Sequence, residues 1–125
     1  MANDQAIAGL VGVRSAIGIG AWVAPRVSGR LFGLDPGNNP QAPYLARLFG
    51  VRDAALGYGL STSRGSQRAL WLRIGIACDL ADAAAGVFAG RRGELPGFAA
   101  VLVTATALGA VALGIAGLQG EQSAA

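Results

Sequence analysis

The apolar residues of this chain are gathered into four long runs that short polar stretches separate. The runs cover Gln5–Ala24, Ala42–Ser61, Ala69–Ala89 and Gly97–Leu118. The last run, "GFAAVLVTATALGAVALGIAGL", has no charged residue over 22 positions. At about 1.5 Å per residue it is long enough to cross a hydrocarbon layer of about 30 Å. The pattern predicts an all-α protein, an integral membrane four-helix bundle that forms one domain over residues 1–125.

The residues at the ends of the runs support this interpretation. All five prolines lie between the runs or in the first turn of one, where a missing N–H group costs nothing. Every Trp and Tyr lies within about one turn of a predicted span end, as expected for an interfacial aromatic belt. These residues are Trp22, Tyr44, Tyr58 and Trp71.

Small residues recur at the spacing that lets helices approach closely in lipid. The pairs are Ala16/Gly20, Gly86/Gly90 and Ala105/Gly109. In the longest connection, "VSGRLFGL" mixes arginine with large apolar residues, and we expect it to lie along the lipid headgroups. The C-terminal stretch "QGEQSAA" is expected to fray.

Composition narrows the function further. Charged residues make up only 14% of the chain, against about 25% in an ordinary soluble domain. All ten basic residues are Arg, and they are scattered, so no basic stripe for nucleic acid is predicted. No His is present and Cys78 is the sole cysteine. The "DLAD" stretch offers two oxygen ligands but lacks a second acidic cluster, so we predict no metal and no cofactor.

Five charged residues lie where charge is most costly. If the runs span the bilayer, Arg14, Arg52, Asp53, Asp79 and Asp82 lie at one depth near its centre. Each such charge costs about 2.5–3.5 kcal/mol, so the second and third runs would insert poorly by themselves. We therefore expect the charges to pair with one another. Asp79 and Asp82 share a helix face, and three carboxylates against two guanidiniums favour a proton shared between these two aspartates.

Two of these charges lie in a repeated phrase. The pattern LxGVRxA occurs at Leu10–Ala16 and again at Leu48–Ala54. It is consistent either with an internal duplication of one helix, inverted because consecutive spans run antiparallel, or with the frequency of such triplets in chains rich in Arg and Ala.

Three functions fit the charged cluster. The first is a small-ligand site or proton relay formed by Arg14, Arg52, Asp53, Asp79 and Asp82, because ionisable groups inside membranes tend to mark such sites. The second is a membrane-embedded acid–base enzyme of isomerase or cyclase type, acting on a lipid-like or terpenoid substrate. Its catalytic candidates are Asp79, Asp82 and Asp53. The third is a scaffold whose ion pairs only specify packing.

The expected partners are the lipid bilayer and either a second copy of the chain or a larger membrane complex, of which this chain would be an accessory subunit. The expected location is the inner (plasma) membrane, with several spans. Four arginines flank the first and third connections and two lie in the second, so the positive-inside rule favours termini outside. The two sets are Arg26, Arg30, Arg91 and Arg92 against Arg64 and Arg68.

Three phrases, "GVRSAIGIGAWVAPR", "LARLFGVRDAALGYGL" and "CDLADA", occur in this order across nearly the whole chain. In them the chain resembles a family of small four-span bacterial membrane proteins of unknown function, distantly similar to the DoxX-like group. The resemblance implies a four-helix membrane bundle. DoxX-like proteins are associated with redox or quinone-linked complexes, but the absence of His and of paired Cys argues against redox chemistry here.

Overall fold

The computed structural model describes residues 2–125, and five helices make up most of this range. The helices are α1 (Ala2–Val23), α2 (Pro25–Leu31), α3 (Ala42–Thr62), α4 (Gly65–Arg91) and α5 (Gly97–Ala124). No strand occurs within the described range, so the predicted all-α class is confirmed. The four long helices cover the four apolar runs, and the short α2 contains the start of the stretch expected at the headgroups.

Proline and glycine set several helix boundaries. Pro25 occupies the first position of α2, Pro43 lies in the first turn of α3, and Pro96 caps α5. Gly93 follows α4 with a φ of 70°, a left-handed conformation that costs a glycine little. These residues produce the short turn that makes α4 and α5 an antiparallel pair.

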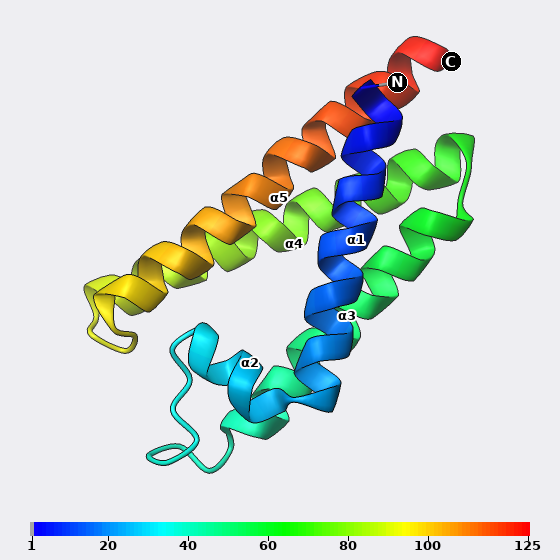
Figure 1. The fold of residues 1–125 in the computed structure, drawn as a ribbon. Helices are drawn as coiled ribbons and strands as arrows, with labels where there is room; N and C mark the ends of the chain where they lie inside the picture. Colours follow the sequence, from blue (N-terminus) through cyan, green and yellow to red (C-terminus); the bar gives the residue numbers. More distant parts are fainter. Residues whose placement is uncertain (1) are drawn as a thin grey trace.

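The long helices form two antiparallel pairs, α1 with α3 and α4 with α5. Figure 1 shows both termini and the α3–α4 turn at one end of the molecule. The pairs converge at this end, where α1 packs on α5, and diverge toward the other end. There α2 packs on α1 and α3, and Gly33 of the following loop lies directly against Ala99 of α5.

The apolar core is small and lies near the converging end. It consists of Ile7, Leu10, Leu60 and Leu72, with Trp71 and residues of α5 packed against it. Trp71 also lies directly against Gly59, so it holds α3 and α4 together, whereas Trp22, Tyr44 and Tyr58 are exposed. Only three of the four expected belt aromatics therefore face outward.

Close helix contacts occur at glycines, but only partly at the predicted ones. A methyl group at Gly86 would lie 2.6 Å from Thr104 Oγ1, and one at Gly90 would lie 2.7 Å from Ala100 Cβ, so this predicted pair does bring α4 and α5 together. Gly109 faces open space, however. Helices α1 and α3 approach closely at Gly18 and Gly50, where added methyl groups would lie 2.9 Å from the Gly50 carbonyl oxygen and 2.8 Å from Ala21 Cβ.

The expected fraying of the C-terminus is wrong. Helix α5 continues to Ala124, because its last turns pack against the start of α1 and carry an ion pair. Gly120 lies directly against Asn3, and Arg68 Nη1 of α4 donates to Glu121 Oε1 at 3.1 Å. A tail that looks polar and free in the sequence is thus held by two other helices.

Within the described range, two helices are long and apolar enough to cross a membrane, α1 over Asn3–Val23 and α5 over Gly97–Ala124. Helices α3 and α4 are long enough, but each carries three charges inside its predicted span, which lowers its hydropathy. Four of these six charges, Arg52, Asp53, Asp79 and Asp82, are those that the sequence places near the centre of the predicted spans.

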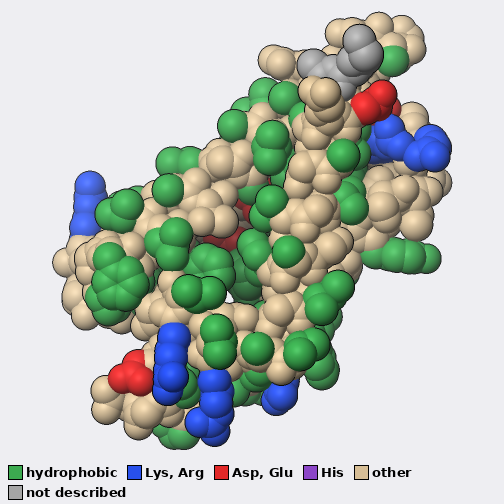
Figure 2. Space-filling view, in the orientation of Figure 1, with side chains coloured by type: hydrophobic (Ala, Val, Ile, Leu, Met, Phe, Trp, Pro, Cys, Tyr) green, Lys and Arg blue, Asp and Glu red, His purple; other side chains and the backbone are tan. Residues whose placement is uncertain are grey.

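Many large apolar side chains are exposed, while several charged side chains are buried. Large apolar side chains are exposed along all four long helices. Examples are Ile19, Val51, Leu80 and Val101. The buried polar or charged residues are Arg14, Asp53, Ser63 and Asp79. Figure 2 shows this outer face, on which apolar side chains are spread over the long helices and charged ones lie mainly at the ends.

Candidate functional site

The site begins with the pairing of the two arginines of the repeated phrase. Arg14 of α1 donates from Nη2 to Asp79 Oδ2 at 2.6 Å and from Nη1 to Asp79 Oδ1 at 3.3 Å. Arg52 of α3 donates to both oxygens of Asp82, from Nη2 at 2.5 Å and from Nη1 at 2.8 Å. Each copy of the phrase therefore makes a two-pronged pair with one carboxylate of α4. Such fork geometry is the strong form of an arginine–carboxylate contact.

Asp53 joins the two pairs into one cluster. Its Oδ1 lies 3.5 Å from Arg14 Nη1 and 3.4 Å from Arg52 Nη2. The structure thus brings together all five charged residues that the sequence singled out. Because Asp79 and Asp82 are three residues apart on α4, each reaches the arginine of a different helix.

The helix packing around Arg14 leaves room for its guanidinium. A methyl group at Gly75 would lie 2.8 Å from Arg14 Nη2, and one at Gly57 would lie 3.4 Å from Arg14 Cβ. Both glycines face the arginine from neighbouring helices. A larger residue at Gly75 would therefore displace the buried guanidinium, whereas a methyl group at Gly57 would make an ordinary contact with the base of the side chain.

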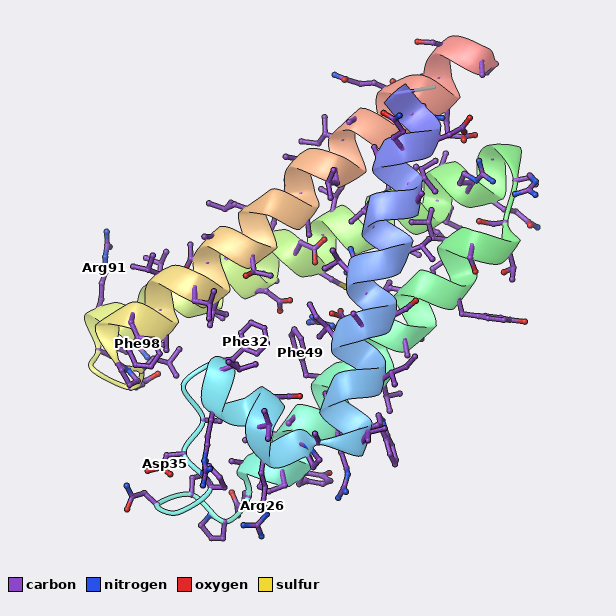
Figure 3. All side chains as sticks on the ribbon, in the orientation of Figure 1. Arg26, Phe32, Asp35, Phe49, Arg91 and Phe98 are labelled. Carbon is purple, nitrogen blue, oxygen red and sulfur yellow. The ribbon has the colours of Figure 1, made fainter. Side chains whose placement is uncertain are left out.

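Arg52 has a different environment. Its guanidinium carbon lies 4.3 Å from the ring centroid of Phe49, which is a cation–π contact. The ring centroids of Phe49 and Phe32 are 6.5 Å apart. Figure 3 shows Phe32 and Phe49 next to each other in the space between α2 and the α4/α5 pair. Sequence reasoning missed both phenylalanines, because nothing in the spacing indicates that α2 folds back toward α3.

A cavity of about 630 Å³ lies next to the charged cluster and touches all five of its members. All five helices contribute to its wall, which is otherwise mostly apolar. The apolar lining includes Ile17, Leu31, Phe32, Leu45, Phe49 and Val103. Figure 2 shows the face of the molecule hollowed between α5 and α1, with acidic side chains at the floor of the hollow.

Position along α1 shows how the cavity relates to the core. Ile7 and Leu10 contribute to the core, Arg14 follows one turn later, and Ile17 and Ala21 line the cavity beyond it. Leu10 also touches the cavity, so the core and the cavity adjoin at the level of the charged cluster. A pocket with an apolar wall and a few convergent polar groups is the usual form of a small-molecule site.

Other features of the chain add little chemistry to this site. Within residues 2–125 no group of three His, Cys, Asp or Glu side chains is placed to hold a metal ion. Arg47 and Arg73, the remaining arginines inside the predicted spans, are both exposed, and Arg47 lies 5.8 Å from the Trp22 ring centroid. These two are therefore outside the cluster.

Comparisons with known protein families, with curated proteins and with solved structures found no match for this chain. The resemblance to the DoxX-like group stays a prediction that depends on the three quoted phrases.

Proposed function

We propose that this chain is a four-span membrane protein of the plasma membrane that binds a small amphiphilic molecule in the cavity between its two helix pairs. In this proposal α3 and α4 also span the bilayer. Their charges at residues 52, 53, 79 and 82 are paired inside the bundle, so their outer faces present mainly apolar side chains. Pairing removes most of the insertion cost that each charge would carry alone.

The observation that carries the proposal is the cavity itself, an apolar volume of about 630 Å³ with a charged cluster at one side. An amphiphile has the same division into an apolar body and a polar head. A scaffold whose ion pairs only specify packing requires no such volume, and neither does a proton relay. The cavity therefore favours the ligand interpretation over both.

The route into the cavity supports a ligand that arrives from the membrane. The hollow lies on the side of the bundle, between α5 and α1, where the surrounding surface is apolar. A molecule dissolved among the lipid tails would enter sideways with its apolar part still surrounded by apolar groups. We expect both termini and the α3–α4 turn on the outer side of the membrane, following the distribution of arginine.

Cross-linking in a lipid-like environment tests this function. The full chain is placed in detergent micelles with photoreactive dodecyl amphiphiles, and labelled residues are mapped by mass spectrometry. We expect labelling of cavity-lining residues of α1 and α5. Thr106→Phe, which fills part of the cavity, should reduce it about tenfold, a loss of about 1.4 kcal/mol in binding.

Ala105→Phe provides the matched control, since it adds the same side chain one residue earlier, on the exposed face of α5. It should leave cavity labelling unchanged. Equal labelling in both variants, or labels confined to the outer surface, would contradict the proposal.

A second candidate, the acid–base enzyme, gains support from the same cavity, because the cavity reaches both Asp79 and Asp82. Asp82 is the better placed of the two, with a side chain 22% exposed against 5% for Asp79. Each is held by an arginine, so a catalytic carboxyl would first have to exchange that partner for substrate. Chromatography and NMR of the recovered amphiphile separate the candidates: an isomerase or cyclase returns a rearranged molecule of the same mass, and Asp82→Asn returns the original one.

A further inference from the structure

The three carboxylates of the cluster do not share the two arginines equally. Arg14 approaches Asp79 to 2.6 Å but Asp53 only to 3.5 Å. Arg52 approaches Asp82 to 2.5 Å but Asp53 only to 3.4 Å. Both short pairs go to α4, and Asp53 is left with two long contacts that converge on a single oxygen, Oδ1. Asp53 is therefore the carboxylate with the weakest pairing.

Asp53 is also deeply placed. Its side chain is 5% exposed, and it forms part of the cavity wall. The charged residues of that wall are Arg14, Arg52, Asp53, Asp79 and Asp82. With all three carboxylates ionised, two positive and three negative groups give the cavity a formal charge of −1. Asp79 and Asp82 each accept through both oxygens from an arginine of their own, so the predicted sharing of a proton between them finds no support in this arrangement, and the unbalanced charge belongs to Asp53.

Charge is more consequential in such a site than in water, because the surrounding groups are apolar and screen it poorly. A ligand with one positive charge would bring the cavity to neutrality and give Asp53 a close partner. A neutral ligand would leave the excess in place. An anionic ligand would increase the excess. The terminal nitrogens of both arginines already donate to Asp79 or Asp82, and Arg52 Nε, which has no hydrogen-bond partner, is buried away from solvent.

The aromatic residues next to the cluster favour the same ligand class. Phe49 already stacks on Arg52, and Phe32 lies beside Phe49 in the cavity wall. The face of an aromatic ring attracts cations, and quaternary ammonium groups are recognised in this way. Phe32 therefore offers an additional surface for a positively charged head group.

We infer that the cavity selects amphiphiles with a single positive charge in the head group, such as a long-chain ammonium compound, with Asp53 as the residue that contacts the head. This inference rests on the proposed function, because it specifies which amphiphile the same cavity takes. It adds a ligand class and a role for one residue, and both can be tested separately from binding as such.

Three photoreactive dodecyl amphiphiles test it, with a trimethylammonium, a hydroxyl and a carboxylate head group. They compete for the full chain in dodecyl maltoside micelles, whose own head group is uncharged, and labelling is corrected for partition into empty micelles. We expect the trimethylammonium compound to bind about tenfold more tightly than the alcohol, with the carboxylate weakest. Asp53→Asn should bring the ammonium and the alcohol to within about twofold of each other.

Asp4→Asn is the matched control, because Asp4 is an exposed carboxylate in the first turn of α1, away from the cavity. This variant should still bind the trimethylammonium compound about tenfold more tightly than the alcohol. Equal binding of the three compounds, or tightest binding of the carboxylate, overturns the inference and leaves the proposed function standing. Failure of all three to label the cavity overturns both. If Asp53→Asn does not assemble, the ranking on the unaltered chain decides.

Discussion

The two ion pairs of the cluster begin with the same sequence and end in different environments. Both arginines follow Gly-Val, and both bind a carboxylate of α4 through two hydrogen bonds. The Arg14–Asp79 pair is enclosed, with both side chains 5% exposed, whereas in the Arg52–Asp82 pair the values are 32% and 22%. Under the proposed function, the first pair mainly holds the helices together, and the second is the one more accessible to a ligand in the cavity.

Packing, and not the pairing itself, produces the difference. Arg14 lies between glycines of α3 and α4 that let the helices close around it. Arg52 has the ring of Phe49 on one side and the cavity nearby. The two copies of the phrase thus supply an enclosed pair and a partly exposed pair because the neighbouring residues differ.

The largest effect is expected from Arg14→Leu. This change leaves Asp79 without its short contact in a buried place, and removing one partner of a buried pair costs about 3–5 kcal/mol. Denaturant unfolding in micelles, followed by circular dichroism, measures the loss. Arg73→Leu removes an exposed arginine of α4 and should change stability by less than about 0.5 kcal/mol. Similar losses in the two variants would remove the basis for calling the Arg14 pair structural.

Arg52→Leu should cost less stability than Arg14→Leu and should sharpen the preference for a cation. The Asp82 side chain stays partly exposed after the change, so we expect a loss of about 1.5–3 kcal/mol, the range for a hydrogen bond to a charged group. Labelling by the trimethylammonium amphiphile should rise relative to the alcohol, because the cavity loses one positive charge. The comparison between the two pairs fails if Arg52→Leu destabilises the bundle as much as Arg14→Leu does.

Gly75→Ala sharpens the comparison from the packing side. The added methyl group would lie 2.8 Å from Arg14 Nη2, so the guanidinium must move, at a cost of about 1–3 kcal/mol. Gly109→Ala is the control, since nothing lies within 4 Å of a methyl group there, and alanine should stabilise its helix by up to about 1 kcal/mol. Thermal unfolding measures both variants: the melting temperature should fall for Gly75→Ala and rise for Gly109→Ala. Shifts in the same direction would contradict the view that Gly75 makes room for Arg14.

The smallest effect is expected at the ends of α4 and α5. Arg68→Gln removes the partner of Glu121 from a partly buried pair, 15% and 13% exposed, that is joined by one hydrogen bond, so we expect a loss of about 0.5–1.5 kcal/mol. Hydrogen exchange should show faster amide exchange in residues 119–124 and no change around Arg14. Unaltered exchange in the last turns would mean that packing alone, including Gly120 against Asn3, holds the C-terminus.

Much of the helical layout follows from the sequence. The four apolar runs predict where α1, α3, α4 and α5 lie, because periodic composition and proline positions determine helix boundaries locally. The sequence also predicts that the five charged residues lie at a similar depth, because the position of each one in its run, multiplied by the helical rise per residue, gives its depth. The partner of each arginine does not follow, since it depends on how the helices rotate and cross.

The cavity is the feature that the sequence conceals most completely. It exists because the helix pairs diverge and α2 folds back to place Phe32 beside Phe49. No local sequence pattern predicts that α2 packs back against α3. Two features of α5 also depend on how distant helices pack and could not be predicted locally. They are the helical C-terminus and the open space around Gly109.

The central claim is that lipid surrounds all four long helices while the charges face one another inside. Leu80 of α4 tests this claim most directly, because it is exposed and lies next to buried Asp79 on a helix whose composition alone does not indicate a span. A spin label is attached through Leu80→Cys with Cys78→Ala, and the full chain is reconstituted in bilayers. The account predicts frequent collisions with oxygen and few with a water-soluble nickel chelate. Dominant relaxation by the chelate would contradict it.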